Sequence, residues 1–120
     1  MVFENLSYKK KLAFARFSFE VAAADEEITD DEIEIIATVG WQMMNLNVAD
    51  EFDTITDFNY GPVLSTLTEE EAIALGAFLG TVAEADGIVE FSELSHIESL
   101  LKETGLNPLI IQTVLKEIQK

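Results

Sequence analysis

The sequence predicts an all-α fold, a compact bundle of about five to seven helices. Apolar residues recur mostly three or four positions apart, as a buried helix face requires. No segment alternates apolar and polar residues for long enough to form a strand, the nearest being Thr54-Ile55-Thr56. Of the 120 residues, 48% are hydrophobic, which is enough to bury one core. We therefore expect a single domain over residues 1–120.

The N-terminal segment could be mistaken for a signal peptide. Lys9–Lys11 precede a largely apolar stretch, Leu12–Ala24, that ends in small residues. Arg16 and Glu20 interrupt this stretch, which favours an amphipathic helix near 8–24. No uninterrupted apolar run approaches the roughly 18–20 residues needed to span a membrane. We predict a cytoplasmic protein with no membrane insertion.

The chain contains an internal repeat. A shift of 61 residues places Leu6–Ile36 on Leu67–Ile97 without a gap, with nine identical pairs in 31 columns. The identical pairs are Leu6/Leu67, Ala13/Ala74, Phe17/Phe78, Val21/Val82, Ala22/Ala83, Ala24/Ala85, Asp25/Asp86, Glu32/Glu93 and Ile36/Ile97. This predicts a duplicated unit of helix, acidic loop and helix, with repeat one at about 6–44 and repeat two at about 67–104.

Capping residues mark where the helices of both repeats begin. Ser7 and Thr68 are suitable N-caps at the same register. Thr68 with Glu71, and Thr29 with Glu32, match the capping-box pattern. We therefore expect helices near 8–24 and 30–44 in repeat one, and near 69–85 and 91–104 in repeat two.

The remaining segments lie between and after the repeats. We expect a short amphipathic helix after Val48 and a turn at Asn59–Pro62. Gly105 should stop the fourth long helix, and Asn107-Pro108 should open a last one with a broad apolar face. Four aromatic residues are interpreted as core: Trp41, Phe52, Phe58 and Tyr60.

The charge distribution excludes some partners. The net charge is −16, and Phe17–Leu101 holds twenty Asp and Glu but no Lys or Arg. Such a surface repels nucleic acid and anionic lipid, and it attracts cations and basic proteins. We expect no nucleic-acid partner, and we keep a basic protein partner as one reading. The acidity can also serve solubility alone.

Four carboxylates in two matched pairs are the candidate metal ligands: Asp25, Glu32, Asp86 and Glu93. In each repeat an Asp ends the first helix, and a Glu follows seven residues later. A carboxylate near a helix C-terminus opposes the helix dipole, which suggests a compensating role such as cation binding. Each Asp could instead close its turn through a side-chain hydrogen bond to the backbone, and the sequence leaves both readings open.

The repeat also bears on the two glutamates. Glu32 can serve the Thr29 capping box, but the second copy has Glu90 where Thr29 stands and still carries Glu93. This favours a shared role beyond capping. If the two acidic loops converge, their oxygen ligands would suit Ca²⁺ or Mg²⁺. The chain has no cysteine, so thiolate metal sites are excluded.

Two other site types fit less well. Asp86–Glu93 matches the second half of an EF-hand loop, but Val82 and Val21 stand where the first ligand is required. Paired carboxylates can do acid–base chemistry, yet the single histidine, His96, is interpreted as a packed residue. We therefore expect a protein that is not an enzyme.

The pattern Ala-Asp-Gly-x-Val/Ile-x-x-x-Glu resembles the motif of the TerB-like family, the tellurite-resistance TerB group and its relatives. It reads Ala85–Glu93 in the second repeat and, less closely, Ala24–Glu32 in the first. The resemblance covers roughly Leu6–Gly105. The first copy departs from the pattern at Glu26, where glycine is usual.

That resemblance carries its own expectations. It implies a single TerB-like all-helical domain with duplicated helix pairs. It implies a metal site formed by Asp25, Glu32, Asp86 and Glu93, and an association with tellurite and other stress responses. Together with the residue patterns, it predicts a non-enzymatic module that binds a divalent cation. The alternative is an acidic interaction module that binds a basic partner without metal.

Overall fold

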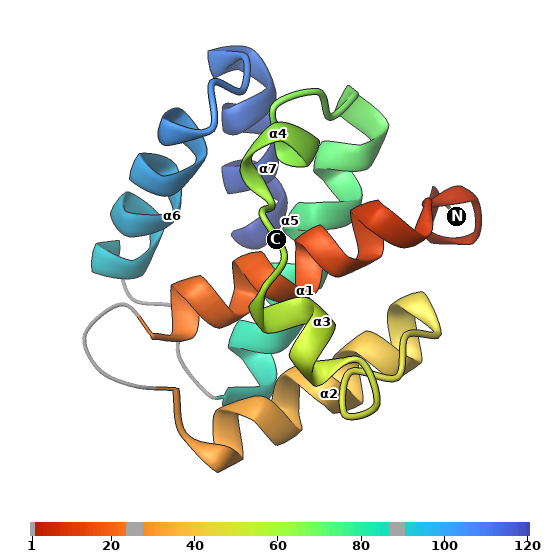
Figure 1. Ribbon diagram of the computed structural model, residues 1–120. Helices are drawn as coiled ribbons and strands as arrows, with labels where there is room; N and C mark the ends of the chain where they lie inside the picture. The colour runs from red at the N-terminus through yellow and green to blue at the C-terminus, as the bar shows by residue number, and fades with distance from the viewer. Residues whose placement is uncertain (1, 24–27, 87–90) are drawn as a thin grey trace.

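The protein is a bundle of helices (Figure 1). The computed structural model describes residues 2–23, 28–86 and 91–120. These residues form one 3-10 helix and seven α-helices, and no strand occurs among them. The elements are η1 (Val2–Asn5), α1 (Tyr8–Ala22), α2 (Asp30–Met44), α3 (Phe52–Thr56), α4 (Gly61–Leu64), α5 (Glu69–Asp86), α6 (Phe91–Glu103) and α7 (Pro108–Ile118). The predicted all-α fold class is confirmed.

The helices begin at the predicted capping residues. The Ser7 hydroxyl accepts a hydrogen bond from the Lys10 N–H at 3.2 Å. The Thr68 hydroxyl accepts from the Glu71 N–H at 3.2 Å, and the Glu71 carboxylate accepts from the Thr68 N–H at 3.0 Å. These bonds satisfy amide groups that have no partner within the helix. At α7, the Asn107 side chain caps the Leu109 N–H at 2.8 Å.

The helix ends also follow from local chemistry. Gly105, two residues after the end of α6, has a φ of +84°, in the left-handed region that favours glycine. Asn45 takes the same region at the end of α2, with a φ of 54°. The segment predicted as a turn at Asn59–Pro62 differs, because a short helix, α4, begins there at Gly61. Pro62 occupies its first turn, where the missing N–H of proline costs no hydrogen bond.

Matching helices of the two proposed repeats start at the same register. Helices α1 and α5 begin at Tyr8 and Glu69, and α2 and α6 begin at Asp30 and Phe91, so each pair is 61 residues apart. The burial pattern follows the same shift, since Phe17 and Phe78 are both fully buried. These observations support the duplication that the sequence predicts.

One ion pair joins equivalent positions of the two repeats. The Lys10 ammonium group pairs with the Glu71 carboxylate, and these residues are also 61 apart. Contacts between equivalent residues are expected where an approximate twofold axis relates two units. Burial raises the pKa of Glu71. Hydrogen bonds from Lys10 and from the Thr68 backbone together lower it by a larger amount, so the pKa of Glu71 lies below the usual value.

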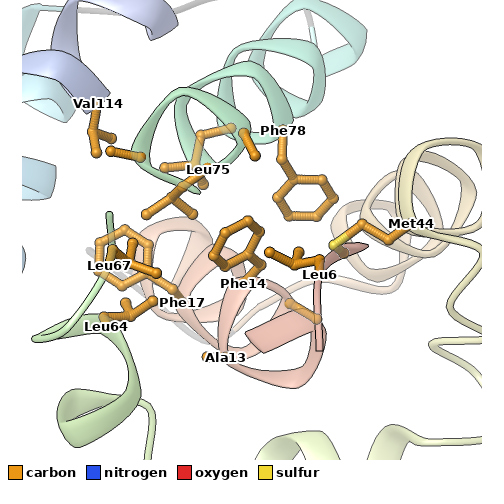
Figure 2. Packing of buried hydrophobic residues seen from close by; sticks show 14 of the residues in the cluster. Leu6, Ala13, Phe14, Phe17, Met44, Leu64, Leu67, Leu75, Phe78 and Val114 are labelled. Carbon is orange, nitrogen blue, oxygen red and sulfur yellow. The ribbon is translucent and has the colours of Figure 1, made fainter. Parts of the chain in front are cut away.

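The core lies between α1, α5 and their neighbours (Figure 2). Phe14 and Phe17 of α1 are fully buried, as are Leu75 and Phe78 of α5. Leu64, Leu67 and Val114 extend this packing toward α4 and α7. Partly buried aromatic residues complete it: Tyr60 meets Phe17 edge to face, with ring centroids 5.4 Å apart. The interpretation of Phe52, Phe58 and Tyr60 as core residues is confirmed.

Trp41 is not a core residue, which corrects the expectation. Its side chain is 56% exposed. Helix α2 buries Ile36, Val39, Gly40 and Met44. At 100° per residue these four positions define one face, and Trp41 lies beyond its edge.

The closest helix pair is α5 with α7, which lie against each other (Figure 1). Gly76 permits this approach, because a Cβ atom there would lie 2.4 Å from the Glu117 Cβ and 2.7 Å from the Val114 carbonyl oxygen. Gly80, one turn later, faces the Ile118 backbone, and a Cβ atom added there would lie 3.2 Å from the Ile118 carbonyl oxygen. Small residues at helix contacts let the two backbones approach closely.

The helices are not membrane-spanning in character. Within the ranges that the structure describes, no helix combines the length and the apolar composition needed to cross a bilayer. Helix α1 instead contributes Leu12, Phe14 and Phe17 to the core, as the amphipathic interpretation of this segment expects.

We predict that Gly76→Ala destabilises the fold by about 1–3 kcal/mol, because the added methyl group would overlap the α7 backbone. The gain in helix propensity, about 1 kcal/mol, offsets only part of this cost. Urea unfolding followed by circular dichroism measures the change. Gly61→Ala is the matched control, since its nearest contact would be 3.7 Å away. Equal stability of the two variants would contradict the close approach.

Candidate acidic site

The four predicted ligands occupy comparable places in the two repeats. Asp86 is the last residue of α5, and Glu93 is the third residue of α6. Glu32 is likewise the third residue of α2. Asp25 lies outside the described residues, and so do the side chains of Asp86 and Glu93. The convergence of the four carboxylates therefore stays a prediction.

Glu32 is part of a complete capping box. Its Oε1 atom accepts hydrogen bonds from the Thr29 N–H and from the Thr29 hydroxyl, both at 2.9 Å. The Thr29 hydroxyl oxygen accepts from the Glu32 N–H at 3.2 Å. Both bonds from Thr29 end on Oε1, so the second carboxylate oxygen stands outside the capping box. The capping role that the sequence suggested for Glu32 is confirmed.

Many carboxylates lie where a helix stabilises them. The first turn of α2 carries Asp30, Asp31 and Glu32, and the first turn of α5 carries Glu69, Glu70 and Glu71. The partial positive charge at a helix N-terminus favours acidic residues there. This accounts for six carboxylates without any ligand.

The C-terminal end of α5 has the opposite electrostatics. Its last turn includes the exposed residue Glu84 and ends at Asp86, and it contains no basic residue. Negative charge at a helix C-terminus adds to the partial negative charge of the free carbonyl groups. Asp86 and Glu84 are thus carboxylates whose positions the dipole does not explain, and of the two only Asp86 is matched by an acidic residue, Asp25, in the other copy.

The basic residues neutralise only a small part of the acidic surface. Four ion pairs occur in the part of the chain that the structure describes: Lys10–Glu71, Arg16–Glu20, Lys102–Glu98 and Lys120–Glu117. The α2 carboxylates of Asp30, Asp31 and Glu34 belong to none of these pairs. In the same part of the chain, no group of three or more His, Asp or Glu residues is arranged to hold a metal ion.

Sequence analysis missed the exposed position of Trp41. The sequence does contain a signal for this exposure. Glu34 lies seven residues before Trp41, Thr38 lies three before it, and Asn45 lies four after it. Residues at these spacings share one helix face, and all three are polar. His96, in contrast, is half-buried on α6, as a packed residue should be.

Comparison with models of known protein families, with curated proteins and with solved structures found no match to this chain. The resemblance to the TerB-like family therefore stays a prediction.

We predict that Thr29→Ala lowers the free energy of unfolding by about 1 kcal/mol, because α2 loses its N-cap. The control is Thr38→Ala, in the interior of the same helix, where alanine should leave stability unchanged or slightly raised. Thermal and urea unfolding compare the two variants. Equal stability of both would show that the capping box contributes nothing.

Proposed function

We propose that this protein is a non-enzymatic module that binds a divalent cation through Asp86 and Glu93, with Asp25 and Glu32 as the equivalent pair. The observation that carries this proposal is the position of Asp86 at the end of α5, in a last turn without a basic residue. A bound cation would offset the repulsion between this carboxylate and the helix terminus. The TerB-like resemblance points to the same four residues.

The second repeat is the stronger candidate. In the first repeat, Glu32 already serves the Thr29 capping box through Oε1. In the second, Glu90 stands where the capping threonine would be, so the sequence there lacks the capping-box pattern. Gly87 follows Asp86, whereas Glu26 follows Asp25, and glycine is the residue that tight turns accept most readily. We therefore assign the tighter binding to Asp86 and Glu93.

The donor set defines the cation class. All four side chains offer carboxylate oxygen, and the chain contains no cysteine. Oxygen ligands favour Ca²⁺ and Mg²⁺ over softer metals. Binding also reduces repulsion in a chain of net charge −16, so the cation should stabilise the folded state.

We predict that Ca²⁺ or Mg²⁺ binds with measurable heat and raises the melting temperature, and that Asp86→Asn with Glu93→Gln abolishes both effects. Isothermal titration calorimetry and thermal unfolding measure them. The control pair, Asp57→Asn with Glu103→Gln, removes the same charge from two exposed positions, one directly after α3 and one at the end of α6, and should keep the response. No heat and no thermal shift at millimolar cation would contradict the proposal.

A second candidate function is an acidic interaction module that binds a basic partner without metal. The exposed α2 carboxylates of Asp30, Asp31 and Glu34 favour it, because they take part in none of the ion pairs of the described ranges. Charge of one sign on an exposed face steers an oppositely charged partner toward it.

For this second function we predict that a lysine- and arginine-rich peptide binds in the presence of EDTA at roughly 50 mM salt, and that binding falls steeply by about 500 mM because salt screens the charges. Fluorescence polarisation of a labelled peptide measures this. A neutral peptide of equal length is the control. Absence of binding at the lower salt concentration would exclude this function.

A further inference from the structure

Trp41 has an exposed aromatic side chain that is not part of the hydrophobic core. Four large apolar residues of the described ranges are exposed: Tyr8, Trp41, Ile73 and Leu109. Tyr8 has a partner within the chain, because its hydroxyl donates to the Glu51 carboxylate at 2.5 Å. Ile73 and Leu109 are aliphatic and offer no directional chemistry. Trp41 offers both a large apolar surface and an electron-rich ring face.

The surroundings of Trp41 form one exposed face of α2. This face, the outer α2 face, consists of Asp31, Glu34, Thr38 and Trp41 on the helix and Asn45 at its C-cap, all of them exposed. Their spacings of three, four, three and four residues place them along one side of the helix. At a rise of about 1.5 Å per residue, Trp41 lies about 10.5 Å along the helix axis from Glu34. The outer α2 face thus carries an aromatic ring and a carboxylate two helical turns apart.

The chemistry of this face selects a partner with arginine. A tryptophan ring attracts cations over its face, and arginine is the cation that most often stacks there. Glu34 offers a carboxylate that a second guanidinium group can bind through two hydrogen bonds. The chain has no Lys or Arg between Phe17 and Leu101, so its own nearby sequence offers no such cation.

We propose that the outer α2 face docks an arginine-containing helix of a basic protein partner, with one arginine stacked on Trp41 and a second paired with Glu34. This inference rests on the second candidate function, the binding of a basic partner without metal. In a partner helix, two arginines seven residues apart have the same separation along the axis as Trp41 and Glu34. Tryptophan and arginine are also the residues most enriched among energetically dominant interface positions.

The test uses synthetic helical peptides of equal net charge, titrated into the full chain in EDTA and followed by calorimetry. One peptide carries two arginines seven residues apart. A second carries them five residues apart, which places them on different faces, and a third has lysines in place of both. We expect the first peptide to bind most tightly. Trp41→Ala should weaken its binding about tenfold or more, and Glu34→Gln should weaken it less.

Matched variants separate docking from general charge attraction. Gln42→Ala is an exposed neighbour on α2 and should leave the affinity unchanged, and Trp41→Phe should restore part of the affinity lost in Trp41→Ala. Because Trp41 is 56% exposed, its replacement should leave the circular dichroism spectrum and the melting temperature nearly unchanged.

Two results would overturn the inference in different ways. If all three peptides bind Trp41→Ala as tightly as the original chain, and salt abolishes binding to both, the outer α2 face is not the docking site, although the acidic interaction function stands. If none of the peptides binds at low salt, the interaction function itself fails, and the docking site fails with it.

Discussion

The fold depends on the burial of α5 on more than one side. Phe78 and Leu75 pack into the core that α1 shares, while Gly76 and Gly80 lie against the backbone of α7. A helix that is apolar around most of its circumference must be enclosed by other elements. Helices α1, α2, α7 and η1 all contact α5. Helix α5 thus joins these four elements around one core.

The acidic composition divides into parts with different physical roles. Carboxylates in the first turns of α2 and α5 stabilise those helices, and four glutamates form ion pairs. Asp86 lies at the unfavourable end of its helix, and Glu34 lies on the exposed face of α2 that also carries Trp41. The helix dipole does not account for the position of Asp86, and Glu34 takes part in none of the ion pairs of the described ranges; both proposals start from these two residues.

The duplication links the fold to these proposals. Equivalent helices start 61 residues apart, and Lys10 pairs with Glu71 across equivalent positions. Yet the two copies have diverged. Thr29 fixes Glu32 in a capping box, whereas Glu90 stands at the matching place in the second copy. Trp41 is matched by Lys102, so the outer α2 face has no counterpart on α6. The tighter of the two proposed cation pairs and the proposed docking face would thus belong to different copies.

The sequence by itself determined the long helices and their caps, because those depend on neighbours within four residues: Ser7, Thr29, Thr68 and Asn107 all cap as expected. The sequence also identified the four candidate metal ligands, because the same Asp and Glu recur at matching positions of the two repeats. Only the tertiary structure decided that Trp41 is exposed and that Gly76 admits α7, because burial depends on which distant helix covers a face.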